Sequence, residues 1–271
     1  MSESFGGPVR PISEPSDPST VASPGPVRVA AVGDLHCTRR SRGDLEPLFA
    51  RMAESADILL LAGDLTDYGT ADEARLLLSE LKPAASRPKI AVLGNHDYEA
   101  GQETEVKKIL SGGGVRVLDG DACEILGLGV AGVKGFLGGF GERMLQSWGE
   151  AATKAIVRED MQQALKLETA LARLRTPTRV VLLHYAPVRA TVEGEPAEIV
   201  PFLGSSRLEE PIHRHPVAAV IHGHAHYGSP KGTTSNGVPV YNVAKPLLRR
   251  RHPDLPPFLT LRLEAGVAHE T

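Results

Sequence analysis

Short apolar runs alternate with longer segments of helical periodicity along most of the chain. Runs of strand length occupy residues 27–32, 58–62, 89–93, 180–184 and 217–222, and each ends in a polar cluster or a turn. Apolar residues recur at helical spacing in residues 45–52, 74–81 and 157–174, and Thr70 with Glu73 forms a capping box before the second of these segments. The pattern predicts an α/β protein.

Three further segments, residues 115–133, 238–243 and 258–263, have a β-like pattern. Together with the first five runs they supply enough strands for two sheets. We therefore expect a four-layer αββα sandwich in which two mixed β-sheets lie between outer helices. Residues 1–26 are rich in proline and serine and show no apolar periodicity, which predicts a flexible tail before a folded domain at residues 27–271.

Composition narrows the classes of function. The 271-residue chain is 41% hydrophobic and has a formal net charge of -3, so it lacks the basic field that makes nucleic acid a main partner. No apolar run approaches the roughly 20 residues that span a bilayer, which predicts no membrane segment. Two cysteines and the absence of a signal-like N-terminus favour a cytoplasmic location.

Side chains that can bind metals directly follow five of the predicted strands. The clusters are Gly33-Asp34-Leu35-His36, Gly63-Asp64-Leu65-Thr66-Asp67, Gly94-Asn95-His96-Asp97, His184-Tyr185 and His222-Gly223-His224-Ala225-His226. Each cluster alone could be an ordinary turn or a structural histidine. Because all five clusters follow apolar runs, they indicate one site at the carboxyl ends of the strands. Carboxylate, imidazole and amide ligands together suit Mn, Fe or Zn.

These motifs, in this order, resemble those of the calcineurin-like metallophosphoesterase superfamily over roughly residues 27–245. The resemblance implies a phosphoester hydrolase with two divalent or mixed-valence metal ions. It implies that Asp34, His36 and His226 hold the first metal, that Asn95, His184 and His224 hold the second, and that Asp64 bridges both. His96 would then be the general acid. By the same resemblance Asp67 orients His96, and Asp97 stays open as a local alternative.

In the expected mechanism, a metal-bridging hydroxide attacks the phosphorus in line and His96 protonates the leaving alkoxide. The protein phosphatases of the superfamily carry an arginine where this chain has Tyr68, which argues against that subclass. The chain resembles the bacterial branch that includes cyclic-nucleotide phosphodiesterases. We expect a small phosphodiester or phosphomonoester substrate, selected by residues 134–149 and 186–207.

Two alternatives stay open. A DNA-repair nuclease of the same superfamily would need a further DNA-facing domain, and little sequence follows residue 245 for one. A non-catalytic metal-binding scaffold typically lacks ligands or the acid, and all of them are present here. The sequence does not indicate the oligomeric state.

Overall fold

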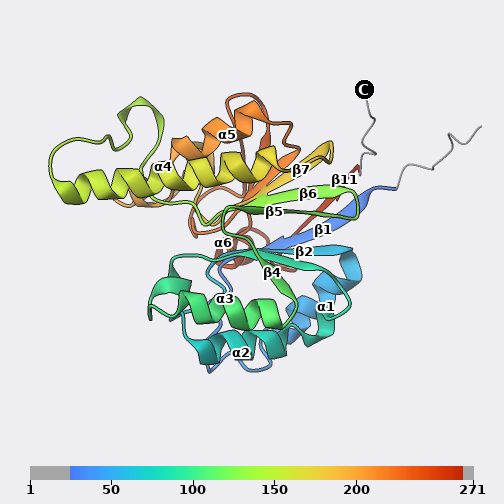
Figure 1. Cartoon of the computed structure of the whole chain (residues 1–271). Coiled ribbons are helices and arrows are strands. Elements are labelled where there is room, and N and C mark those ends of the chain that lie inside the picture. Colours follow the sequence, from blue (N-terminus) through green and yellow to red (C-terminus); the bar gives the residue numbers. More distant parts are fainter. Residues whose placement is uncertain (1–24, 265–271) are drawn as a thin grey trace, which may run out of the picture.

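The computed structural model of the protein describes residues 25–264, so the predicted tail lies almost wholly outside the described residues. Two β-sheets stack face to face with helices on both outer sides (Figure 1). The strands of the first sheet are, in spatial order, β11 (Leu259–Leu263), β1 (Val27–Val32), β2 (Ile58–Ala62), β3 (Lys89–Val92) and β4 (Val115–Val117). Strands β1 to β4 are parallel, and β11 pairs antiparallel with β1 at the edge.

The second sheet also has parallel strands in the middle, but its strands at both edges are antiparallel to their neighbours. Its strands are, in spatial order, β5 (Asp121–Ile125), β6 (Leu128–Gly132), β7 (Thr178–Leu182), β8 (Ala219–His222), β10 (Pro239–Asn242) and β9 (Lys231–Thr233). Strands β5 and β9 are antiparallel to their neighbours. Both sheets are mixed, which confirms the predicted sandwich.

Helices cover the outer face of each sheet. The first sheet packs against α1 (Glu46–Ser55), α2 (Ala71–Glu80) and α3 (Glu103–Gly112), and the second against α4 (Ala151–Ala172) and α5 (Glu209–Arg214). Helix α6 (Lys245–Arg251) follows β10. Single turns of 3-10 helix are η1 (Lys82–Ala84), η2 (His96–Tyr98), η3 (Gly141–Arg143), η4 (Arg189–Thr191), η5 (Val200–Phe202) and η6 (Ser206–Leu208). Within residues 25–264, no helix combines the length and the apolar character that a bilayer crossing requires.

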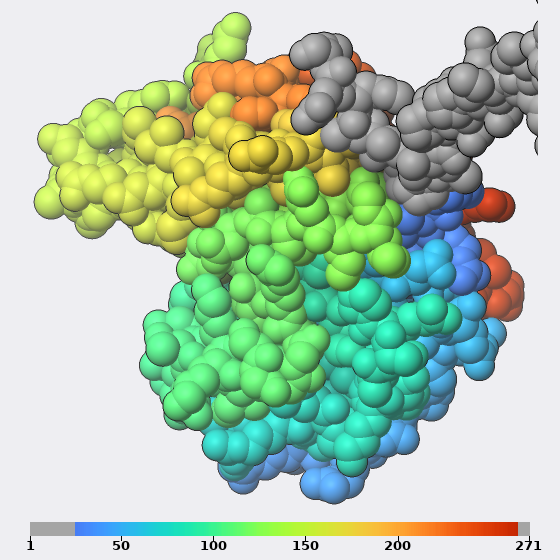
Figure 2. Space-filling model, turned by 45° about the vertical axis from the view of Figure 1, so that its right-hand side comes forward, coloured from blue at the N-terminus to red at the C-terminus, as the bar shows by residue number. Residues whose placement is uncertain are grey.

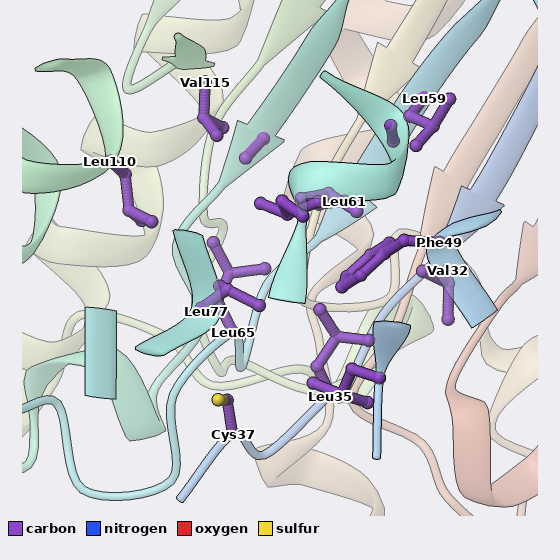
Figure 3. Close-up of a cluster of buried hydrophobic side chains, with 14 of the residues drawn as sticks. Val32, Leu35, Cys37, Phe49, Leu59, Leu61, Leu65, Leu77, Leu110 and Val115 are labelled. Atoms are coloured by element: carbon purple, nitrogen blue, oxygen red, sulfur yellow. The ribbon is translucent and has the colours of Figure 1, made fainter. Parts of the chain in front are cut away.

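The alternation of side chains along each strand separates the core into layers. In β2, Leu59 and Leu61 face the cluster under the first three helices, whereas Ile58 and Leu60 face the cluster between the sheets. Figure 3 shows Phe49 among the strand residues of the outer cluster. Because both faces of the central strands are buried, these strands are continuously apolar up to their carboxyl ends, where the polar clusters begin.

The predicted capping box at α2 is confirmed. The Thr70 side chain accepts from the Glu73 backbone N–H, and the Glu73 carboxylate accepts from the Thr70 backbone N–H at 3.2 Å. The Glu73 carboxylate also accepts from the Tyr68 N–H at 3.1 Å. This helix start therefore also fixes the backbone of residues 67–70, which follows the polar cluster of β2.

Candidate metal centre

The predicted ligands come together at the carboxyl ends of β1, β2, β3, β7 and β8. Two glycines make the close approach possible: a side chain at Gly94 would collide with the Asp64 carboxylate, and one at Gly223 would collide with the Asp34 carboxylate. Five non-glycine residues of the described chain have positive φ, and four of them are predicted ligands: Asp34, His36, Asp64 and His224. Strained backbone concentrated in this way is typical of a functional site.

Asp34, His36 and His226 form the first group. One donor atom from each lies within 4.8 Å of the others, and the Asp34 Oδ1 to His226 Nε2 distance is 2.9 Å. The His224 backbone N–H donates to both Asp34 oxygens at 3.0 Å, which fixes the carboxylate. Burial lowers the pKa of His226, but the hydrogen bond and charge of Asp34 outweigh burial and raise it.

The second group contains Asp64, His184 and His224, again within 4.8 Å. Asn95 joins it, because its Oδ1 lies 2.9 Å from His184 Nε2. His184 Nδ1 lies 3.0 Å from the Ala62 carbonyl oxygen, so this nitrogen must carry the proton. Burial holds the pKa of His184 well below its usual value. The Nε2 lone pair therefore faces the Asn95 oxygen and an Asp64 oxygen at 3.4 Å. A bound cation would satisfy these converging acceptors.

Asp64 lies between the two groups and is 1% exposed. Its oxygens lie 3.9 Å from His36 Nε2 and 3.4 Å from His184 Nε2. Burial, together with the charges of Asp34 and Asp97, raises its pKa well above the usual value. The His36 Nε2 atom is buried and has no hydrogen-bond partner in the part of the chain that the structure describes. The residues present thus fit two cations, with Asp64 able to contact both.

His96 lies next to Asp67, one of its two predicted partners, whose carboxylate is 3.9 Å from His96 Nδ1. Its Nδ1 donates to the backbone carbonyl of Asp67 at 2.8 Å, whereas the Asp67 carboxylate accepts from His36 Nδ1 at 2.9 Å. The Asp97 carboxylate is fully buried and accepts from the backbone N–H groups of Gly94, Leu65 and Thr66. Asp67 therefore touches His96 through its main chain and a predicted ligand through its side chain. His96 Nε2 is left available, and the His96 side chain is 36% exposed.

Asp67→Ala should weaken cation binding by about 10- to 100-fold, because the His36 ring loses the acceptor that fixes its tautomer and direction. The Asp67 carbonyl, and with it the His96 contact, is kept. Calorimetric titration with Mn²⁺ measures the effect, and Asp72→Ala, which removes an exposed carboxylate on α2, is the control. An unchanged affinity in Asp67→Ala would contradict this role.

His222 has a structural role, as its position in the strand suggested. It is fully buried, and its Nε2 lies 2.8 Å from Thr191 Oγ1 while Nδ1 donates to the Gly223 carbonyl. Burial lowers its pKa to about 4. Both ring nitrogens are occupied, so this histidine does not take part in the metal centre.

The two segments expected to select the substrate are joined to each other. Gly139 forms a bridge with Ser205, and the Gly138 N–H donates to the Pro201 carbonyl at 3.1 Å. The Arg207 guanidinium donates to the Leu145 carbonyl at 2.8 Å. In Figure 2 the region around α4, in yellow and yellow-green, projects beyond the lower half formed by earlier residues. Residues 134–149 and 186–207 thus form one hydrogen-bonded unit.

Two cavities are lined by residues that lie close in sequence to the predicted ligands. One of about 550 Å³ is lined by Arg39, Arg40, Asp67 and Tyr68, and one of about 500 Å³ by Tyr98 and Lys134 among others. Lys134 was not among the predicted site residues. Lys134 directly follows an apolar strand, as the predicted ligands do, and this position in the sequence could have identified it.

The model of the calcineurin-like phosphoesterase family matches residues 27–228. A curated relative, an uncharacterized metallophosphoesterase of Aquifex aeolicus (strain VF5), is 35% identical over 103 residues, which is 36% of this chain and 38% of the relative's length. The phosphopantetheinyl hydrolase of Mycobacterium tuberculosis has a TM-score of 0.61 at 17% identity, covering 88% of this chain and 96% of that one. A protein of Thermus thermophilus has a TM-score of 0.50 at 17% identity, covering 88% of this chain and 99% of that one. The two solved structures show a shared fold.

Proposed function

Because the chain belongs to the calcineurin-like phosphoesterase family and is a metal-dependent phosphoester hydrolase, we propose that it cleaves a small phosphodiester or phosphomonoester with His96 as the general acid. One observation carries the proposal: acceptor atoms of His36 and His184 face the Asp64 carboxylate, and the Asn95 oxygen faces His184, with no proton donor among them. Such a site is poised for two cations.

The residues have distinct tasks in this reaction. Asp34, His36 and His226 would hold one cation, and Asn95, His184 and His224 the other, with Asp64 shared. When bound, the cations would supply Lewis acidity at the phosphoryl oxygens and a nucleophile at neutral pH. Mn, Fe and Zn suit this ligand set.

The contacts of His96 support its proposed role as the proton donor. Its Nδ1–H is held by the Asp67 carbonyl, and its backbone N–H donates to Asp64 Oδ1 at 2.9 Å. In the imidazolium form Nε2–H can therefore donate to a leaving oxygen while the ring stays fixed. The proposal includes one domain at residues 27–271, of which residues 265–271 lie outside the described residues. It also includes a cytoplasmic location, which the buried, unpaired Cys37 and Cys123 support.

The enzyme is tested first by hydrolysis of p-nitrophenyl phosphate and bis-p-nitrophenyl phosphate with added Mn²⁺, Fe²⁺ or Zn²⁺. A protein inactive on both esters with every metal would contradict the proposal and favour a non-catalytic scaffold. A panel of cyclic nucleotides, nucleotides and phospholipid head groups then narrows the substrate. A phosphopantetheinyl ester belongs in the panel, because the M. tuberculosis neighbour is named for that hydrolysis and the likeness extends over most of both chains.

His96→Ala should keep its metals and lose about 10²- to 10⁴-fold in kcat with alkyl phosphate esters, whose leaving groups need a proton. The loss should be much smaller with p-nitrophenyl esters, because p-nitrophenolate leaves without one. His213→Ala, which removes a histidine on α5 that pairs with Glu209, is the matched control. Equal losses on good and poor leaving groups would exclude the general-acid role.

A further inference from the structure

Lys134 is fixed against the metal centre by its main chain. It follows β6 at the carboxyl end, and its carbonyl accepts from the backbone N–H groups of His184 at 3.1 Å and Tyr185 at 3.0 Å. The next N–H, that of Gly135, donates to Gln163 Oε1 at 3.1 Å. The position of Lys134 is therefore tied to the strand end that carries a metal ligand.

The side chain of Lys134 lies among three aromatic rings. Its Nζ is 4.7 Å from the ring centroid of Phe136, 5.1 Å from that of Tyr185 and 5.4 Å from that of Tyr98. The Tyr185 ring also packs on His224, with 4.4 Å between centroids. Ring faces attract and orient an ammonium group. The rings therefore hold this cation close to the second group of ligands.

The Lys134 ammonium group makes one hydrogen bond within the described part of the chain. Nζ donates to the Gly135 carbonyl at 3.0 Å, and no carboxylate in the described chain lies within salt-bridge distance of it. An ammonium group has three donors, so two are left without a protein partner. Burial lowers the pKa of Lys134 to about 8, which still leaves it mostly charged at neutral pH.

These donors border the cavity of about 500 Å³, which is also lined by two other cations, Lys107 and Lys166, and by three carboxylates, Glu103, Asp119 and Glu159. Lys166 is paired with Asp119 at 3.0 Å, so its charge is already balanced within the protein. A partly buried cation beside a metal centre, with unused donors, suits an anionic ligand.

Resting on the proposed hydrolase function, we propose that Lys134 binds an anionic oxygen of the substrate phosphate and acts as the phosphate clamp of this site. The clamp comes from the end of β6 in the second sheet. A fixed cation attracts a dianion more strongly than a monoanion. Lys134 thus favours phosphomonoesters, with two negative charges, over phosphodiesters, with one.

The test replaces the charge and keeps the shape. Lys134→Met keeps most of the chain that packs among the rings, Lys134→Arg keeps the charge, and Lys166→Met is the control in the same cavity. In the Mn²⁺-loaded protein, Lys134→Met should lower kcat/KM for p-nitrophenyl phosphate by about 10- to 100-fold. The loss of kcat/KM for bis-p-nitrophenyl phosphate in the same variant should be several-fold smaller. In Lys134→Met the inhibition constant of inorganic phosphate should rise by a factor similar to the loss of kcat/KM for p-nitrophenyl phosphate. Its metal content should stay unchanged. Lys134→Arg should restore part of the activity.

Unchanged phosphate inhibition in Lys134→Met would overturn the proposal, as would equal losses on both esters or a loss that Lys166→Met reproduces. If Lys134→Met does not fold, Lys134→Gln carries the same comparison. A wild-type protein inactive on both esters would instead contradict the proposed hydrolase. The clamp would then still be tested by calorimetric binding of phosphate to the Mn²⁺-loaded wild type and Lys134→Met, where equal affinities would overturn it.

Discussion

Asp64→Ala should lose about 10³-fold or more of kcat/KM and fall below full metal occupancy. Asp64 lies between the two groups of predicted ligands, with oxygens 3.9 Å from His36 Nε2 and 3.4 Å from His184 Nε2. Without it the two cations lack a common anion, and the several kcal/mol of transition-state stabilisation that they supply is lost. Metal content is measured by plasma mass spectrometry and kcat/KM with bis-p-nitrophenyl phosphate.

Asp64→Asn separates charge from shape in the same experiment. The amide oxygen can still accept from the His96 N–H, so the loop keeps its position, but the bridging charge is gone. Because Asp64 is buried beside other carboxylates, its charge is unfavourable in the metal-free protein. The metal-free variant should therefore be at least as stable as metal-free wild type, although it is less active. Full metal content with full activity in either variant would contradict a bridging role.

The sequence was sufficient to predict the layers and the place of the site. Central strands buried on both faces are continuous apolar runs, as in residues 58–62, and they end where the polar clusters start. A ligand cluster at a strand end can therefore be recognised without knowing which strands are neighbours. The parallel order β1-β2-β3 then places Asp34, Asp64 and Asn95 at one edge.

The partner of His96 could not be chosen from spacing. Asp67 and Asp97 both lie near it in the sequence or in the expected site, and each carries a carboxylate. The choice depends on tertiary contacts: Asp97 turns into the core to accept three backbone N–H groups, and the Asp67 side chain turns to His36. Side-chain types alone do not predict that the backbone carbonyl of Asp67 holds His96.

Helix α3 shows a second limit. Only Val106 and Leu110 are buried on it, and it ends at the first of three consecutive glycines, so the apolar stripe is too short to distinguish a helix from a loop. Its N-cap makes no side-chain hydrogen bond. The helix is stabilised by packing against its neighbours, including Leu77 of α2 in the outer cluster, and such contacts are not local in sequence.

Asp160 of α4 and Arg207 form an ion pair that joins the two segments expected to select the substrate, residues 134–149 and 186–207, to the long helix. Asp160 Oδ2 accepts from Arg207 Nη1 at 2.6 Å and from Ser205 Oγ at 2.8 Å, and Arg207 Nη2 donates to the Leu145 carbonyl. The side chains are 0% and 10% exposed. Burial raises the pKa of Asp160 despite these partners, so the pair does not fully offset its desolvation.

Asp160→Ala should therefore lower the free energy of unfolding by about 3–5 kcal/mol, because it leaves the Arg207 charge buried and unpaired. Asp72→Ala is the matched control: its pair with Arg39 has the same 2.6 Å separation, but the side chains are 53% and 78% exposed, and its removal should cost at most about 1 kcal/mol. Urea unfolding of both variants measures the difference. Losses of similar size would show that distance rather than burial sets the strength of these pairs. If burial sets the strength of the pair, the double change Asp160→Leu with Arg207→Met should lower the free energy of unfolding less than Asp160→Ala alone, because no unpaired charge remains buried.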